Sequence, residues 1–368
     1  MSFNLEIMRT RLTLALLAAL ASLFLVSASA RIAQAQILQE PPPPPPKPKP
    51  KPQPTPKDED YEVVRVTSNL VVVPVSVTNA AGQPMLGLKL SDFHLEEEGR
   101  AQEVAQMGDP EQTPLDIALL LDVSSSVQSR FTFEQQAAAS FLKQVLKPGD
   151  RATVFAIDEK PRFVEELTTA ERASAKLMTV LPANGYTAFY DTVIAAANYL
   201  EKSSSSGRRK VIVVISDGDD TARIVDVSSA QNRKGGDLKV IGMDAQLKLV
   251  DRSVAEVERD IQRAEITFYS INPSGQTMHL NVRTARAENG MEKMAEATGG
   301  AAFIPTNLED LNAMFNQIAS ELRSQYLLQY YSNNESTGNR YLRIKVSVPT
   351  QPQLRLRARQ GYYPKNAK

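Results

Sequence analysis

The chain has 368 residues, a length that suits one large core with accessory segments rather than a single small domain. Its 42 lysines and arginines balance its 42 aspartates and glutamates, so no net charge attracts nucleic acid, and we expect no nucleic-acid partner. Cysteine is absent, which excludes disulfides, thiolate metal sites, a cysteine nucleophile and a lipid-bearing N-terminal cysteine. The two histidines, His94 and His279, leave few candidates for catalysis that needs an imidazole.

Residues 1–35 have the pattern of a secretory signal peptide. Arg9 and Arg11 precede an apolar run over residues 12–26, and Ala-x-Ala cleavage sites follow at residues 28–30 and 33–35. We therefore expect an exported protein, located in the periplasm, the cell envelope or outside the cell. The apolar stretch approaches the ~17–25 residues that span a bilayer, so an uncleaved N-terminal membrane tether is the alternative.

Residues 36–60 form a linker rich in proline and lysine. Proline fixes φ and lacks an amide donor, so residues 40–57 are predicted to form an extended polyproline II rod of about 3.1 Å per residue. The lysines keep the rod solvated. The linker therefore predicts a spacer between the N-terminal segment and the folded part of the chain.

Residues 61–111 and 324–368 have β-type patterns at the two ends of the folded part. Strands are predicted at residues 63–66, 69–78, 90–99 and 102–104 before the core, and at 325–331, 341–348 and 354–359 after it. Each group is too small to bury a core alone, so we expect the two groups to form one small β-sandwich-like domain. Arg355, Arg357 and Arg359 alternate along the last strand, which we interpret as a solvated face, with polyanion binding as the alternative.

Residues 112–323 alternate between strand-like and helix-like segments, which predicts an α/β fold with a doubly wound, mostly parallel sheet inserted into the β domain. Strands are predicted at residues 116–121, 152–157, 211–215, 266–271 and 301–304. Helices are predicted at residues 131–146, 170–181, 188–200, 253–263, 288–298 and 308–323. Residues 220–251 are less regular, and we interpret them as a loop insertion with a short strand at 238–241.

Polar side chains gather where three of these segments end. Asp122, Ser124 and Ser126 follow the first strand, Thr187 lies in a glycine-containing loop before a helix, and Asp217 follows the strand at 211–215. In open α/β sheets such loops meet at the carboxyl edge, which is where ligands bind. Two carboxylates and three hydroxyls form an all-oxygen ligand set, which favours Mg²⁺, with Mn²⁺ and Ca²⁺ as the alternatives. Because so few carboxylates neutralise the metal, it remains attractive to a carboxylate from outside.

These five positions resemble a known motif. Asp122-x-Ser124-x-Ser126, Thr187 and Asp217 are similar, in order and type, to the metal-ion-dependent adhesion site (MIDAS) of von Willebrand factor type A (vWA) domains. The resemblance implies that the serines and the threonine bind the metal, that the aspartates act largely through water, and that a partner protein supplies the last ligand from an Asp or Glu. The segments at 87–99 and 357–363 resemble the flanks of an acidobacterial VWFA-related family.

Other interpretations remain open at this site. The same groups could cap loops and helix starts without binding a metal. Asp191, one helical turn after Thr187, could orient Thr187 or could be an ordinary carboxylate at a helix start. We expect an adhesion-type binding module rather than an enzyme, because no general base is evident. The alternatives are metal-assisted hydrolysis at the same site and an envelope scaffold or spacer with no metal-dependent role.

Overall fold

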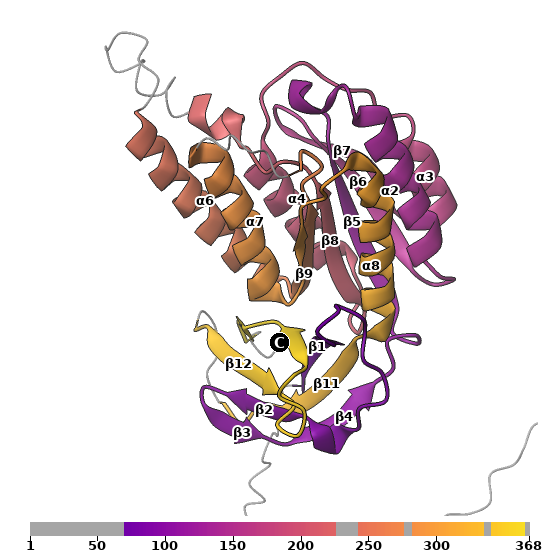
Figure 1. Ribbon diagram of the computed structural model, residues 1–368, viewed down its shortest axis with the longest axis vertical. Coiled ribbons are helices and arrows are strands. Elements are labelled where there is room, and N and C mark those ends of the chain that lie inside the picture. The colour runs from indigo at the N-terminus through magenta and orange to yellow at the C-terminus, as the bar shows by residue number, and fades with distance from the viewer. Residues whose placement is uncertain (1–69, 226–241, 276–281, 335–339, 365–368) are drawn as a thin grey trace, which may run out of the picture. The chain divides into compact units, whose positions relative to one another are not determined.

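The computed structural model describes residues 70–364 apart from residues 226–241, 276–281 and 335–339 (Figure 1). The predicted signal peptide at 1–35, the predicted linker at 36–60 and the predicted strand at 63–66 lie outside the described residues, as does the side chain of Ser126. None of the helices in the described ranges is long and apolar enough to cross a membrane.

The central element, within the described part of the chain, is a six-stranded sheet in the order β10-β9-β8-β5-β6-β7. Its strands are β5 (Leu115–Asp122), β6 (Arg151–Ile157), β7 (Pro161–Thr168), β8 (Arg209–Ile215), β9 (Ile266–Ile271) and β10 (Ala302–Phe303). All neighbouring pairs are parallel except β6 and β7, which are antiparallel. The predicted mostly parallel α/β sheet is therefore confirmed.

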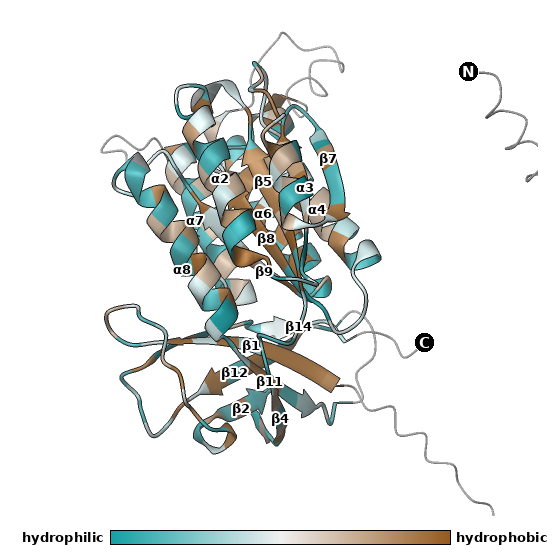
Figure 2. Cartoon of the chain, turned by 90° about the vertical axis from the view of Figure 1, so that its right-hand side faces the viewer, coloured by the Kyte–Doolittle hydropathy of each residue, from teal (hydrophilic) through white to brown (hydrophobic). Residues whose placement is uncertain are grey.

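Strand β7 was missed in the sequence. Its residues are exposed or half-buried at every position but one, and only Glu165 is buried. An edge strand of this kind lacks the apolar run by which a buried parallel strand is recognised, and much of it is hydrophilic in Figure 2. By contrast, β5 is buried at all its positions and is covered on both faces.

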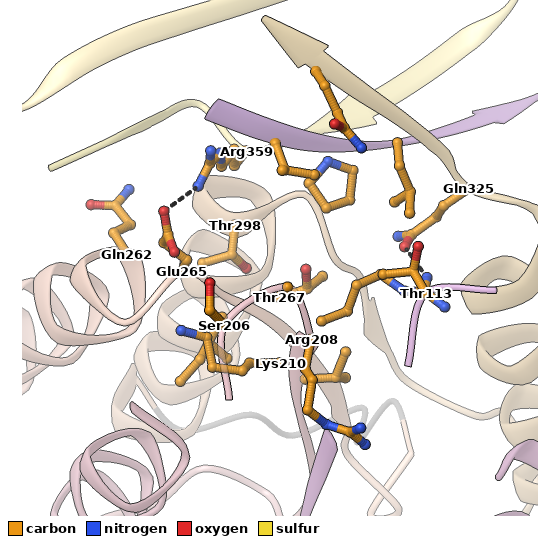
Figure 3. A pocket seen from close by; sticks show the side chains of 18 of the residues that line it. Thr113, Ser206, Arg208, Lys210, Gln262, Glu265, Thr267, Thr298, Gln325 and Arg359 are labelled. Atoms are coloured by element: carbon orange, nitrogen blue, oxygen red, sulfur yellow. Dashed lines mark hydrogen bonds and ion pairs between the residues drawn. The ribbon is translucent and has the colours of Figure 1, made fainter. Parts of the chain in front are cut away.

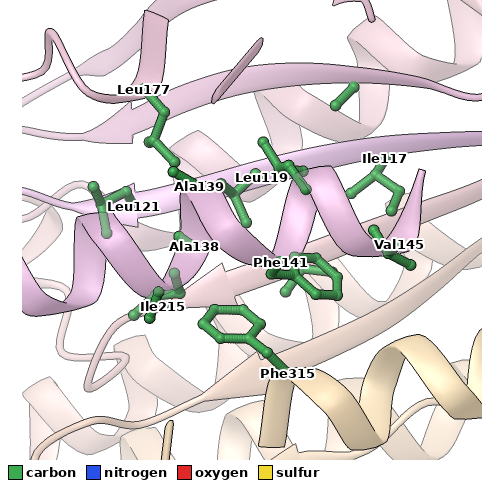
Figure 4. Packing of buried hydrophobic residues seen from close by; sticks show 14 of the residues in the cluster. Ile117, Leu119, Leu121, Ala138, Ala139, Phe141, Val145, Leu177, Ile215 and Phe315 are labelled. Atoms are coloured by element: carbon green, nitrogen blue, oxygen red, sulfur yellow. The ribbon is translucent and has the colours of Figure 1, made fainter. Parts of the chain in front are cut away.

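Helices cover both faces of this sheet (Figure 1). One face packs against α2 (Phe131–Val145), α3 (Ala170–Leu177) and α8 (Leu311–Ser324), and the other against α4 (Phe189–Ser203), α6 (Met243–Arg263) and α7 (Val282–Thr298). On the first face, Phe141 of α2 stacks on Phe315 of α8 with ring centroids 4.7 Å apart (Figure 4). Such an aromatic pair contributes about 0.5–1.5 kcal/mol beyond the apolar area it buries.

Helix α6 begins ten residues before the predicted helix at 253–263, so the predicted loop insertion at 220–251 is wrong over residues 243–251. Val250, Val254, Val257 and Ile261 recur at helical spacing and are buried, but charged residues between them obscure the pattern in the sequence. Residues 221–225 are also helical. The predicted short strand at 238–241 lies outside the described residues.

Two small antiparallel sheets are built from strands of both chain ends (Figure 2). One has the order β13-β1-β11-β4, with β1 (Leu70–Thr78), β4 (Val104–Gly108), β11 (Tyr326–Tyr331) and β13 (Arg355–Ala358). The other has the order β14-β12-β2-β3, with β2 (His94–Glu97), β3 (Arg100–Gln102), β12 (Leu342–Ser347) and β14 (Gly361–Tyr362). Val73 and Leu328 of the first sheet share one apolar core with Leu95 and Leu342 of the second.

The α/β part and the β part meet around the buried carboxylate of Glu321, near the end of α8. Its Oε1 accepts hydrogen bonds from Ser76 Oγ at 2.8 Å and from Tyr269 OH at 2.9 Å, and its Oε2 pairs with Arg357. Arg359 is only 8% exposed. The predicted solvated arginine face is therefore wrong at Arg357 and Arg359, because the α/β part covers this side of β13 and the segment after it.

Candidate metal site

The three predicted loops lie at the carboxyl edge of the central sheet. Strands β5 and β8 are parallel neighbours with Leu121 opposite Ile215, so the segments that follow them start side by side. A cavity of about 610 Å³ opens at this edge, and Ser124, Thr187 and Asp217 all line it. The fold therefore brings together side chains from segments separated by almost a hundred residues.

Asp122 lies beneath this cavity and is fully buried. Its Oδ1 accepts the backbone N–H of Ser124 at 2.9 Å, and its Oδ2 accepts the hydroxyl of Ser216 at 2.6 Å. Burial raises the pKa of Asp122 to about 6, and the negative charge of nearby Asp217 adds to the effect, while the hydrogen bonds oppose it. A buried carboxylate in this position favours a neighbouring cation.

Thr187 is held by the segment that follows β8. Its backbone N–H donates to Thr221 Oγ1 at 2.8 Å, and its carbonyl accepts the N–H of Ala222 at 3.2 Å. Thr187 is 7% exposed and Ser124 is 5% exposed, so both residues are buried in the cavity wall rather than free in solvent. The predicted ligand Ser126 cannot be placed, since its side chain lies outside what the structure describes.

The turn after β8 positions Asp217. Ser216 Oγ accepts the N–H of Gly218 at 3.0 Å, and Asp217 Oδ1 accepts the N–H of Asp219 at 3.1 Å. Gly218 has φ of +77°, which side chains with a Cβ rarely adopt. Asp219 in turn pairs with Arg283 at 2.7 Å, so it neutralises an arginine.

Asp191 lies in the first turn of α4, and its Oδ1 accepts hydrogen bonds from Arg223 Nη2 at 2.6 Å and Nε at 3.1 Å. Asp220 holds the start of the same helix, because its Oδ2 accepts the N–H of Tyr190 at 2.9 Å. Burial raises the pKa of Asp220 to about 6. The possible role of Asp191 in orienting Thr187 stays a prediction.

Residues 117–219 match the family model described as von Willebrand factor type A domain, a span that includes all five predicted ligand positions. The chain carries a vWA domain. None of the curated proteins compared with the chain matches it. The comparisons give no support to the predicted membership of the acidobacterial VWFA-related family.

Three solved structures resemble more than half of the chain. The vWF domain of the type V pili tip protein Mfa5 from Porphyromonas gingivalis is 14% identical, with a TM-score of 0.41, over 56% of this chain and 94% of that one. A von Willebrand factor type A protein from Catenulispora acidiphila is 14% identical, with a TM-score of 0.42, over 70% and 51%. Proximal thread matrix protein 1 from the mussel byssus, with a zinc-occupied MIDAS motif, is 15% identical, with a TM-score of 0.40, over 61% and 49%. At these TM-scores the likenesses carry no argument about function.

The donor set of this vWA domain fits a hard divalent cation. The described polar side chains that line the cavity carry hydroxyls, carboxylates and the amide of Asn184, and none of them has a sulfur or an imidazole. Among the described residues, no three His, Cys, Asp or Glu side chains are arranged to hold a metal ion. That result does not bear on the predicted set, which has two carboxylates and depends on the hydroxyls of Ser124, Ser126 and Thr187 for the rest.

A further carboxyl group lies close to Asp122 and Asp217 of the candidate metal site and was missed in the sequence. Glu134 of α2 is 0% exposed, and Arg130 Nε donates to its Oε1 at 3.2 Å. Burial raises the pKa of Glu134 to about 7; the charges of Asp122 and Asp217 contribute to this rise, and Arg130 opposes it. Its Oε2 has no hydrogen-bond partner among the described residues. The negative field of this group adds to the attraction for a cation at the cavity.

Proposed function

We propose that this chain is an exported, metal-dependent protein-binding module of the adhesion type. A divalent cation, Mg²⁺ with Mn²⁺ or Ca²⁺ as substitutes, is held by Ser124, Ser126 and Thr187 together with Asp122 and Asp217. One observation carries the proposal, namely the convergence of Ser124, Thr187 and Asp217 on one cavity above the buried carboxyl of Asp122.

The partner is a protein that presents an Asp or Glu side chain. Only two carboxylates in the set neutralise the cation, so an outside carboxylate gains a strong electrostatic attraction there. The cavity also has an exposed wall, because Tyr186 is 51% exposed and lies beside Thr187 in the lining. A protein surface could therefore approach the cation from this side.

We propose binding rather than catalysis because two carboxyl groups of raised pKa at this sheet edge are buried, and a third, Asp219, lines the cavity but is ion-paired with Arg283. Glu134 and Asp122 are both 0% exposed, so neither can touch a molecule in the cavity as a general base. Export rests on the signal-peptide pattern of residues 1–35 and on the Pro/Lys-rich linker after it.

The proposal is tested by partner capture from a cell-envelope extract in Mg²⁺ and in EDTA. Wild type is expected to retain an envelope protein in Mg²⁺ and to release it in EDTA, and Asp122→Ala is expected to capture none. Asp244→Ala is the matched control, because the side chain of Asp244 is 84% exposed and, among the described residues, pairs with Lys248 on the surface of α6. Circular dichroism melting checks that the variants are folded. Capture that is indifferent to EDTA, or equal in Asp122→Ala, would overturn the proposal.

A further inference from the structure

The segment after β6 forms part of the wall of the metal cavity. The carbonyl of Ile157, the last residue of β6, accepts the N–H of Val123 at 3.2 Å. The next carbonyl, that of Asp158, accepts the N–H of Ala188 at 2.8 Å. Val123 follows β5, and Ala188 follows Thr187. The segment after β6 is therefore held between two of the loops that carry the proposed metal ligands.

Glu159 belongs to this segment, and it lines the metal cavity together with Thr187. Its backbone N–H donates to Asp158 Oδ1 at 2.9 Å. Its side chain lies against Gly185, because a Cβ built on that glycine would be 2.6 Å from Glu159 Oε1 and 2.7 Å from its Cγ. The missing side chain at position 185 thus leaves the space that Glu159 occupies, two residues before Thr187.

The carboxyl group of Glu159 is exposed, and no hydrogen bond or ion pair holds it among the described residues. Asp219 of the same cavity differs, because it pairs with Arg283 at 2.7 Å. So does Glu265 in a cavity of about 520 Å³ at the start of β8, where it pairs with Arg359 at 3.8 Å (Figure 3). Glu159 is therefore free to turn toward a cation in the metal cavity.

Glu159 lies on the side from which a partner would approach the cation. Asp122 is buried beneath the cavity, whereas Glu159 is exposed and lies against Gly185, the chain neighbour of the exposed Tyr186. A carboxylate attached to the wall competes with a dissolved one at an effective concentration on the order of millimolar or higher. Glu159 is therefore the carboxylate that an outside ligand has to outcompete.

We propose that Glu159 is an internal ligand of the metal site, whose carboxylate pairs with the cation until the acidic side chain of a partner takes its place. This inference rests on the proposed metal-dependent function and adds selectivity to it. A free carboxylate in solution does not displace Glu159. A partner protein does so when further contacts with the chain hold its Asp or Glu at the cavity.

The first test is calorimetric titration of the metal-free full chain with Mg²⁺ in potassium chloride. Glu159→Ala is expected to lower the Mg²⁺ affinity about tenfold, because it removes one of three carboxylates from the site. Glu166→Ala is the matched control. It removes the same charge from a side chain of β7 that is 67% exposed and does not line the cavity, so it is expected to bind Mg²⁺ as wild type does.

The second test repeats the titration with chloride replaced by acetate at equal ionic strength. Acetate has a carboxylate but none of the further contacts of a partner protein. In Glu159→Ala, acetate is expected to raise the Mg²⁺ affinity several-fold relative to wild type, because it enters the position that Glu159 leaves. Binding of Mg²⁺ by acetate in solution affects both proteins equally, so the ratio of their affinities isolates the effect at the site.

Equal Mg²⁺ affinities of wild type and Glu159→Ala would overturn the role of Glu159 and leave the proposed metal site standing. A loss in Glu159→Ala that acetate does not reduce would also overturn it, since Glu159 would then act only through the loop at Gly185. Glu159→Gln keeps the contact with Gly185 and is expected to lose affinity as Glu159→Ala does; unchanged affinity there would equally contradict the assignment. No Mg²⁺ binding by wild type would overturn both this inference and the proposed function.

Discussion

Glu134 predicts a specific dependence of stability on pH. The pKa of this buried carboxyl is raised from 4.5 to about 7, so the folded state holds its proton more tightly than the unfolded state does. The resulting stabilisation is fully present below pH 4.5 and is lost as the pH rises through 7. At about 1.4 kcal/mol per pH unit, the loss between these values is about 3 kcal/mol. Glu134→Gln keeps the shape and cannot ionise, so it should lack this loss.

Urea unfolding of wild type and Glu134→Gln at pH 4.5, 6 and 8, in EDTA, measures the effect. The free energy of unfolding of the variant, relative to wild type, is expected to rise by about 3 kcal/mol from pH 4.5 to pH 8. Other groups titrate in both proteins, so the difference isolates Glu134. Glu292→Gln, at an exposed position of α7, is the control and should parallel wild type. A difference between Glu134→Gln and wild type that does not change with pH would refute the reasoning.

Three further predictions concern the core, the metal loop and proton competition. Phe315→Ala removes a fully enclosed ring stacked on Phe141 and should lower the free energy of unfolding by about 3–5 kcal/mol in urea; a loss below 1 kcal/mol would contradict the packing. Gly218→Ala places a Cβ at positive φ, 2.9 Å from the side chain of Met291, and should therefore distort the loop that carries Asp217. We expect Mg²⁺ affinity in calorimetry to fall about tenfold or more, and an unchanged affinity would contradict this prediction. Protons compete with the metal at Asp122, so the apparent Mg²⁺ affinity should fall by up to about tenfold per pH unit below pH 6. An Mg²⁺ affinity that does not change between pH 7 and pH 5 would show that Asp122 takes no part in metal binding.

The fold could be predicted where apolar runs are long. The strands β5 and β8 are buried on both faces, so each contains a continuous apolar run, at residues 117–121 and 211–215, that is recognisable without tertiary information. The strand β7 could not be found this way, because its stability depends on pairing with β6 at the sheet edge. The burial of Arg359 could not be predicted either. The alternation of arginines at 355, 357 and 359 suggested a solvent-exposed face, but contact with another part of the chain buries Arg359.

The candidate site was predictable where residue types recur at a fixed spacing. The Asp122-x-Ser124-x-Ser126 motif and the aspartate after β8 can be recognised in the sequence alone, and the fold brings their segments together at one cavity. Thr221 and Glu134 could not be predicted, because a single hydroxyl or carboxyl gains its role only from the segment packed against it. Thr221 holds the backbone of Thr187 from another loop, and Glu134 approaches from α2.

The most direct test of the central claim is calorimetric titration of the metal-free chain with Mg²⁺ at pH 7.5. Wild type and Asp244→Ala are compared with Thr187→Ala and Asp217→Asn. Wild type and Asp244→Ala are expected to bind one Mg²⁺ per chain, and the other two variants to lose at least about tenfold in affinity, since each loses a metal-binding oxygen or its charge. Equal Mg²⁺ binding by all four proteins, or no binding by wild type, would contradict the assignment of a metal site to this cavity.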